Sequence, residues 1–278
     1  MALATRFYIP TIERVSINYA LDAGSWDAAY PSINTLDNNL DSYAKSVSSI
    51  QAGLYLDTGD PTVADALQYS FAGVWVHNYR SHSSPPNELR IEVQTSANAS
   101  FTPYNTLGTI YCNPSTTMPL AVLTFPPNAE RYVALFLYNA YTRIEVSLAM
   151  IGVYIDLENV QWDWGRPDGT YTFRNASEDL SGGRTVVRNM SSGLTRRWRR
   201  RYEFLTSSQR SAIVSAHIGA QGRFQPFIIQ DGTESIRNSK LVRFTHDEMI
   251  TDIQVANGLW HVEFEVEEVP YIQAGYSY

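Results

Sequence analysis

Two segments of the chain carry dense charge of opposite sign at a spacing that favours ion pairing. Residues 196–201 contain five arginines around Trp198, and residues 260–267 alternate apolar with polar, mostly acidic, side chains. This alternation is the pattern of a strand with one buried and one polar face. Opposite charges that face each other across strands contribute about 0.2–1 kcal/mol per pair. We therefore expect the two strands to meet, either within one chain or between neighbouring copies.

Three interpretations of the arginine-rich segment differ in what faces it. A nucleic-acid surface normally belongs to a basic domain, whereas this chain has a net charge of −7. A merely solvated strand leaves the alternating aromatic residues without a role. An ion-pairing face against the acidic strand explains both composition and sign, within or between subunits. The predicted oligomer interface comprises Arg197, Arg199, Arg201, Glu263, Glu265 and Glu267.

Motifs for catalysis and metal binding are weak. Ser42 and Lys45 match S-x-x-K, but the S-D-N and K-T-G motifs that accompany it in β-lactamases are absent. Residues 246–248 cluster three polar side chains without the H-E-x-x-H spacing, and we interpret them as a solvated loop. Asp57 and Asp60 flank a glycine and are interpreted as a turn. We expect no catalytic residues, no metal site and no cofactor.

Composition places the chain among folded proteins made without export. Its 278 residues give room for two domains, and 44% hydrophobic with 13% aromatic residues argues against wholesale disorder. Cys112 is the single cysteine, so an internal disulfide is excluded. The chain begins without a secretory signal pattern, and no apolar run is long enough to span a bilayer. We expect synthesis in a reducing cytoplasm and no membrane partner.

The pattern along the chain predicts a mainly β protein in three parts. Residues 1–55 read as an irregular N-terminal arm, residues 56–152 as a β-sandwich, and residues 153–278 as a second β domain. Strands are expected at residues 63–69, 71–77, 88–94, 120–125, 131–138, 143–151, 226–230, 241–245, 252–256 and 260–269. Residues 131–138 are apolar on both faces, which indicates a central strand.

One helix is expected at residues 207–219. Thr206 and Gln209 have the spacing of a capping box, in which each side chain accepts a backbone N–H at the helix start. Ile213, Ala216 and His217 fall on one face and are expected to pack against the second domain.

Two resemblances extend this picture. The segments ADALQYSFAGVWVHN, ELRIEVQTSANASFTPYNT and AERYVALFLYNAYTRIEVSLAMIG resemble the galactose-binding-like, or discoidin, β-sandwich family. The segments RRWRRRYEFLTSSQRSAIVSAHIGAQGRFQPFIIQDG and WHVEFEVEEVP resemble the tail-tube-like β-barrel of distal tail and baseplate proteins of long-tailed phages. In those proteins the tube-like domain often comes first, so the order here is unusual.

The resemblances imply a phage virion structural protein, made in the host cytoplasm, that forms a ring between tail tube and tip. The expected partners are further copies in a homo-oligomeric ring, a hexamer or a trimer, with the tail tube and tip or hub proteins, while DNA passes through the lumen. The alternative is a carbohydrate-binding module for host surface polysaccharide. Discoidin-type lectins bind sugars through apical loops, and the matching loops here offer His77, Tyr79, Arg80, His82 and Tyr104.

Overall fold

The computed structural model describes most of the chain as antiparallel β-sheet with one α-helix. The described residues are 3–10, 26–36, 40, 42–48, 51–57, 68–78, 89–111, 120–138, 142–162, 170–180, 184–222, 225–231, 239–246 and 250–269. The chain divides into two compact units, one of residues 8–154 and one of residues 1–7 with 155–278. The expected fold class, mainly β with one helix, is confirmed. Within the described residues, no helix is long and apolar enough to cross a membrane.

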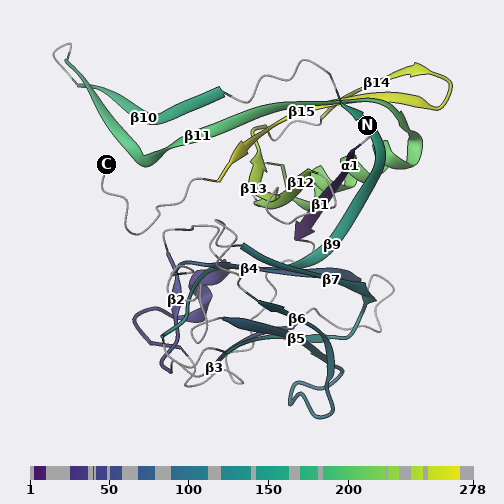
Figure 1. The fold of residues 1–278 in the computed structure, drawn as a ribbon. Coiled ribbons are helices and arrows are strands. Elements are labelled where there is room, and N and C mark those ends of the chain that lie inside the picture. The colour runs from purple at the N-terminus through teal and green to yellow at the C-terminus, as the bar shows by residue number, and fades with distance from the viewer. Residues whose placement is uncertain are drawn as a thin grey trace. The chain divides into compact units, whose positions relative to one another are not determined.

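The unit of residues 8–154 is a sandwich of two sheets. One sheet has the strand order β3 (Gln51–Asp57), β8 (Tyr132–Tyr138), β5 (Arg90–Ser96) and β6 (Asn105–Tyr111). In the other, β4 (Tyr69–Val76) lies between β7 (Leu120–Asn128) and β9 (Glu145–Trp162), and β2 (Ala44–Lys45) adds to β9. Figure 1 draws β4 and β7 in one layer and β3, β5 and β6 in the other.

The core of the sandwich follows from period-two alternation. Leu54 of β3, Ile91 of β5 and Leu135 of β8 are fully buried and form one cluster with Val74 of β4 and Val146 of β9. Because alternate side chains of a strand point to opposite faces, residues such as Tyr55, Glu92 and Phe136 lie on the outer, partly exposed face of the β3-β8-β5-β6 sheet. The strand β4 is buried on both faces. The apolar strand β8 lies inside its sheet, between β3 and β5, as its sequence predicts.

Part of the segment that sequence assigned to an irregular arm belongs to the sandwich. Trp26 and Ala44 lie in its core, and the indole Nε1 of Trp26 donates a hydrogen bond to the carbonyl of Gly53 at 2.8 Å. Between them, η2 (Ser32–Leu36) forms one 3-10 turn. The strand β3 also begins within the predicted arm of residues 1–55. Its seven residues are too few for their alternation to stand out from the turn-rich sequence before them. The boundary between the two units lies between residues 154 and 155.

The second unit is built on strands β10 (Thr170–Leu180), β11 (Arg184–Thr206), β15 (Leu259–Glu268), β13 (Ser239–Phe244) and β12 (Phe227–Asp231), paired in that order. The strand β14 (Thr251–Ala256) pairs with β15, and β1 (Leu3–Pro10) contributes Phe7 to the core. The order of paired strands continues from β12 through β1 to β9, and β9 also pairs with β11 over two residues, Trp162 with Tyr202 and Gln161 with Glu203. The strand order of this unit therefore returns to β11.

The helix α1 (Ser207–Gly219) has the predicted bounds and start. Gln209 N donates to Thr206 Oγ1 at 3.3 Å and Thr206 N donates to Gln209 Oε1 at 2.9 Å, which completes the capping box. The predicted buried face of Ile213, Ala216 and His217 is confirmed. It lies beside a core of aromatic rings, with the His217 ring 4.7 Å from that of Phe244.

Candidate functional site

The two charged strands pair with each other within one chain. In the antiparallel register of β11 and β15, Arg197 is opposite Glu267. The next pairs on the same face are Arg199 with Glu265 and Arg201 with Glu263. The alternate residues Trp198, Arg200 and Tyr202 are buried. Of the two possibilities that the sequence left open, the structure thus contains pairing inside the chain.

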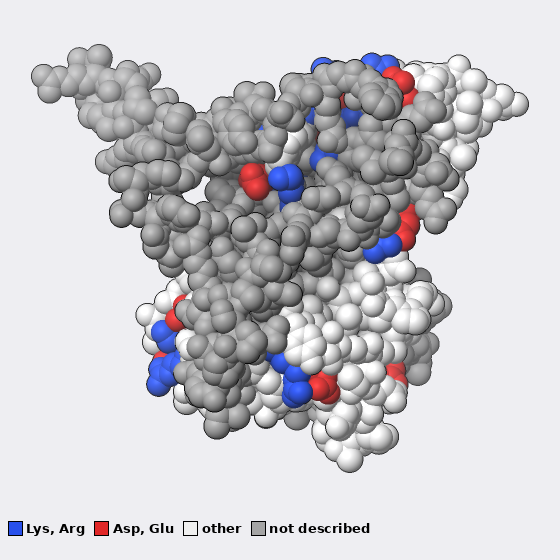
Figure 2. All heavy atoms as spheres, viewed as in Figure 1, with Lys and Arg blue, Asp and Glu red and all other residues white. Residues whose placement is uncertain are grey.

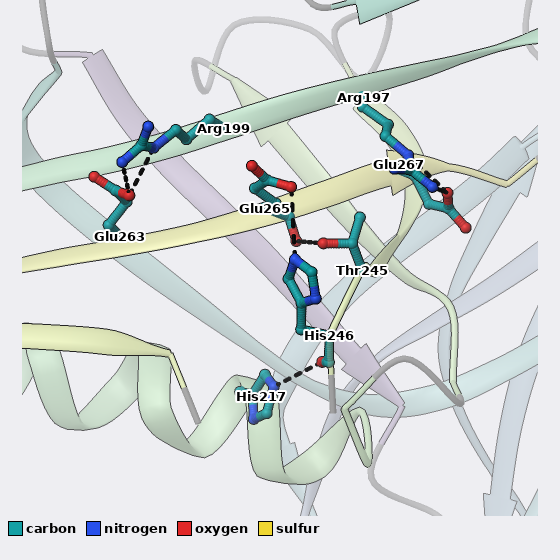
Figure 3. Close-up of polar contacts among 8 residues, drawn as sticks. All are labelled: Arg197, Arg199, His217, Thr245, His246, Glu263, Glu265 and Glu267. Carbon is teal, nitrogen blue, oxygen red and sulfur yellow. Dashed lines mark hydrogen bonds and ion pairs between the residues drawn. The ribbon is translucent and has the colours of Figure 1, made fainter. Parts of the chain in front are cut away.

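The ion pairs on this surface differ in burial. Glu267, which is 6% exposed, accepts from Arg243 Nε at 2.6 Å and from Arg197 Nη2 at 3.2 Å. Arg199 instead reaches diagonally to Glu263, with Nε donating to Oε1 at 2.6 Å. Figure 3 shows the pairs of Arg197 with Glu267 and of Arg199 with Glu263 along the two strands. It also shows His246, whose Nε2 is 3.6 Å from Glu265 Oε2. The charges that suggested contact with a second copy therefore have partners in their own chain.

Neither charged strand forms the edge of its sheet. β11 lies between β10 and β15, and β15 lies between β11 and β13, so much of their backbone is already paired. Addition of a strand from a second copy needs an unpaired edge. Any contact of these six residues with a second copy would have to use the side-chain face, and this stays a prediction.

Of the five predicted carbohydrate-binding residues, the structure describes His77 and Tyr104. Tyr79, Arg80 and His82 lie outside the described residues. His77 is stacked on Tyr43, with ring centroids 4.5 Å apart, and its Nδ1 lies 3.1 Å from Ser147 Oγ. Tyr43 in turn stacks on Tyr30 at 5.0 Å. These contacts fasten the lead-in segment to the sandwich, so the described face of His77 serves packing.

Tyr104 lies in a loop at the other end of the sandwich from His77. His77 directly follows Val76, the last residue of β4. At the other end of β4, the hydroxyl of Tyr69 donates a hydrogen bond to the carbonyl of Glu130 at 2.9 Å. Asn105, next to Tyr104, donates to Glu130 Oε1 at 2.9 Å. The eight residues of β4 place its two ends about 26 Å apart, at about 3.3 Å per residue.

A group of aromatic rings covers the outer face of the β3-β8-β5-β6 sheet. Tyr55 of β3 lies edge-to-face with Phe136 of β8, with centroids 5.5 Å apart. Tyr138 follows two residues later on the same strand face, and its ring centroid is 6.3 Å from that of Phe136. All three side chains are half-buried. Together with Phe101 we call these residues the aromatic face.

Phe101 comes from the second predicted loop, residues 96–105. Its ring lies 5.4 Å from that of Tyr55 and 6.4 Å from that of Phe136, and it is 8% exposed. Phe101 has a φ of 49°, a left-handed conformation that is rare for a bulky residue. The loop therefore bends back so that Phe101, rather than the more exposed Tyr104, completes the row of rings.

Polar side chains border the aromatic face. The guanidinium carbon of Arg90 lies 4.4 Å from the centre of the Tyr138 ring. Glu92, two residues along β5, accepts hydrogen bonds from Gln94 Nε2 and from Thr106 Oγ1. Burial raises the pKa of the Tyr138 hydroxyl, and Glu92 raises it further, whereas Arg90 opposes this and Tyr104 adds a smaller increase. Tyr138 therefore remains a neutral donor and acceptor at neutral pH.

The aromatic face has the parts that sugar recognition requires. The faces of a pyranose ring carry C–H groups that pack on aromatic rings, while its hydroxyls exchange hydrogen bonds with polar side chains. Within the described residues, no group of three or more His, Cys, Asp or Glu could hold a metal ion. In the view of Figure 2, most of the visible acidic side chains lie beside basic ones. Uncharged residues, drawn white, make up most of the other described surface in this view.

Comparison with known proteins finds distant likeness to carbohydrate-binding modules. No protein-family model matches the chain, and no curated protein matches it. It is similar to a pectin-binding carbohydrate-binding module, with TM-score 0.35, 12% identity, and coverage of 45% of this chain and 84% of that chain.

Two further solved structures are similar. Chitosan-binding module 1 from a chitosanase/glucanase of Paenibacillus sp. IK-5 has TM-score 0.34 and 12% identity, over 45% of this chain and 86% of that one. Truncated AlyQ, with CBM32 and alginate lyase domains, has TM-score 0.36 and 11% identity, over 91% of this chain and 57% of that one. These scores are low, so the functional argument rests on the geometry of the aromatic face.

None of the four rings of the aromatic face was predicted from the sequence as a site residue, and in the second loop the predicted residue was Tyr104 rather than Phe101. The alternation of residues 132–138 could have indicated the outward position of Phe136 and Tyr138. It could not indicate that Tyr55 would lie beside them, because that requires the register of β3 against β8, in which Gly53 is opposite Phe136.

Proposed function

We propose that the chain binds carbohydrate through the aromatic face of its sandwich unit. The observation that carries the proposal is the row of half-buried rings, Tyr55, Phe136 and Tyr138, on the solvent side of a sheet. Such rings are usually withdrawn into a core, and a row of them at the surface marks a binding site. The planes of Phe136 and Tyr138 are 27° apart, whereas Tyr55 is edge-on to Phe136 at 89°, so the arrangement offers a sugar chain one pair of nearly parallel rings with a third ring at its border.

The proposal is for binding without catalysis. The polar groups that border the rings have structural partners, such as the bidentate hydrogen bonds from Arg131 Nε and Nη2 to Asp57 at 2.8 and 2.9 Å. A carboxylate held in this way is a weak candidate for a general acid or base. The role of the face is therefore to hold the chain on a polysaccharide, as on a host surface.

Affinity electrophoresis and calorimetry of the full chain against polysaccharides test this function. We expect Tyr55→Ala and Phe136→Ala each to weaken binding about tenfold or more, since loss of an aromatic contact costs on the order of 1–3 kcal/mol. Both variants need a melting curve, because each ring is also part of the packing. Tyr138→Ala provides a third variant at the end of the row.

A matched control is Phe204→Ala in the other unit, where Phe204 is 52% exposed. This substitution removes an exposed aromatic ring without touching the aromatic face, so polysaccharide binding should be unchanged. If the folded Tyr55, Phe136 and Tyr138 variants bound as the unmodified chain does, the aromatic face would not be the site.

A second candidate function is that of a ring-forming virion subunit in a phage tail. The observation in its favour is the hairpin of β10 and β11, which Figure 1 draws as a two-stranded arm. Residues 175–180 pair with residues 184–189, whereas β15 pairs with β11 from residue 197 onward. A two-stranded hairpin alone is marginally stable in water, so contact with a second copy would stabilise it.

Light scattering on the full chain after size exclusion tests this second function. A ring predicts one large species, and Arg199→Glu with Arg201→Glu should convert it to a folded monomer if the charged face contributes. Deletion of residues 174–190 with a short turn in their place tests the hairpin separately. A monomer at all concentrations would exclude a ring formed by this protein alone.

A further inference from the structure

We propose that Arg90 and Glu92 make the aromatic face selective for neutral polysaccharides whose sugars carry adjacent hydroxyl groups. This inference rests on the proposed carbohydrate-binding function and adds the class of ligand. It depends on the positions of two charged side chains beside two aromatic rings.

The register of β5 against β8 places a charge beside each ring. Arg90 is directly opposite Tyr138, and Glu92 is directly opposite Phe136. The two charged residues lie two positions apart on one strand, so their Cα atoms are about 7 Å apart and both side chains point to the outer face. A sugar packed on Phe136, beside the Tyr138 ring that Arg90 covers, would therefore have a donor and an acceptor along the same edge.

Arg90 presents hydrogen-bond donors at this edge. It is exposed, its guanidinium lies over the Tyr138 ring, and within the described residues it forms no ion pair with a carboxylate. Contact with the ring face orients the planar guanidinium, so less side-chain freedom is lost when a ligand binds. Its N–H groups can donate to a sugar hydroxyl.

Glu92 presents acceptors. Its Oε1 receives Gln94 Nε2 and Thr106 Oγ1, and these two hydrogen bonds hold the carboxylate in place. A carboxylate has about four lone-pair sites, so capacity for a sugar hydroxyl remains. A hydroxyl both donates and accepts, and two adjacent hydroxyls can therefore satisfy Glu92 and Arg90 together.

The charge balance of the face favours a neutral ligand. Arg90 and Glu92 sum to zero, and Asp57, which is opposite Tyr132 at the other end of β8, is paired with Arg131. An added carboxylate on the sugar would gain one arginine but would approach Glu92. The whole chain carries a net charge of −7, which also repels a polyanion. Both contributions act against acidic polysaccharides.

The experiment compares matched polymers on the full chain. Neutral galactan, galactomannan and xyloglucan are measured by calorimetry beside the same polymers with primary hydroxyls oxidised to carboxylates. We expect at least one neutral polymer to bind and its oxidised form to bind about tenfold or more weakly, because a charge placed beside Glu92 costs on the order of 1.4 kcal/mol. The affinity for the neutral polymer should change little between low and high salt.

Three variants assign the effect to residues. Arg90→Gln and Glu92→Gln should each weaken binding of the neutral polymer about tenfold, because each removes a charged hydrogen-bond partner. Glu92→Gln should also reduce the preference for the neutral over the oxidised form. The control Arg143→Gln removes an exposed arginine elsewhere in the sandwich unit and should leave both affinities unchanged. Melting curves establish that each variant is folded.

The outcomes separate this inference from the proposed function. Stronger binding of the oxidised polymer, or normal binding by folded Arg90→Gln and Glu92→Gln, overturns the neutral-diol inference while carbohydrate binding stands. If Tyr55→Ala lost binding while Arg90→Gln and Glu92→Gln bound normally, the neutral-diol inference would again be overturned and carbohydrate binding by the aromatic face would stand. Absence of binding to every neutral and oxidised polymer overturns both.

Discussion

Tyr55 lies over Gly53, at a distance that leaves no room for a side chain at position 53. A Cβ added to Gly53 would be 2.8 Å from Cε2 of the Tyr55 ring and 3.1 Å from its Cζ. The two residues are neighbours on the outer face of β3, and Gly53 is opposite Phe136 in the register. The missing side chain lets the ring lie close to the sheet, where it meets Phe136.

We predict that Gly53→Ala displaces the Tyr55 ring and weakens polysaccharide binding. Overpacking of this kind costs about 1–3 kcal/mol of folding stability. Calorimetry gives the affinity, and urea unfolding gives the stability. In the double variant Gly53→Ala with Tyr55→Ala, the stability cost of the alanine should largely disappear, because the ring that it meets is gone. Additive costs would contradict this contact.

A second prediction concerns the attachment of the lead-in segment. Trp26→Phe keeps a ring in the core but removes the N–H that donates to the Gly53 carbonyl at 2.8 Å. The loss should be about 1–3 kcal/mol, because a buried carbonyl is left without its donor. Urea unfolding measures it, with Ile33→Ala at a 48% exposed position as the control. Equal stability of the two variants would show that this hydrogen bond contributes nothing.

A third prediction contrasts the two ion pairs of the charged strands. Glu267→Gln should cost about 1–3 kcal/mol, because it removes the buried carboxylate that accepts charged hydrogen bonds from both Arg197 and Arg243. Glu263→Gln should cost about 1 kcal/mol or less, since its partner Arg199 has 65% of its side chain exposed. Chemical denaturation of both variants provides the measurement. If Glu263→Gln lost more free energy of unfolding than Glu267→Gln, the more buried carboxylate would not be the more stabilising one.

A fourth prediction concerns pH. Burial, followed by Glu92, raises the pKa of Tyr138 above the ordinary value of 10.0. A raised pKa in the folded state means that the stability contribution of neutral Tyr138 is complete below pH 10.0 and is lost as the pH rises through the folded pKa. Tyrosinate absorbance, compared between the unmodified chain and Tyr138→Phe, gives the value.

The same titration tests the neighbours of Tyr138. Arg90→Gln should raise the pKa of Tyr138 further, because the positive charge of Arg90 opposes the increase, and Glu92→Gln should lower it. Opposite directions in these two variants are the expected result. Shifts of the same sign would mean that the charges act through a change in structure.

Sequence alternation predicted which face of a strand is buried, but not which strands become neighbours. For β11 and β15, the alternating residues correctly separated the charged face from Trp198 and Tyr202, and complementary charge correctly predicted that the strands meet. Whether they meet within a chain depends on the path between residues 206 and 259, which includes α1 and three strands. Charge patterns alone leave that path open.

The carbohydrate loops show the same limit. His77 and Tyr104 are both polar aromatic loop residues, yet they lie at opposite ends of β4. Loop composition indicates exposure but contains no information about distance between loops. The ring that the second loop contributes, Phe101, was not distinguishable from its neighbours by composition, because its position depends on a left-handed backbone conformation.

The sequence by itself determined the local properties of this protein: the mainly β class, the helix at residues 207–219 with its cap, the central place of β8, and the complementary charge of two strands. These depend on contacts a few residues apart or on a repeat of two. Only the tertiary structure decided that Tyr55, Phe101, Phe136 and Tyr138 form one surface beside Arg90 and Glu92. That surface depends on the register of strands distant in sequence, which packing of the whole core fixes.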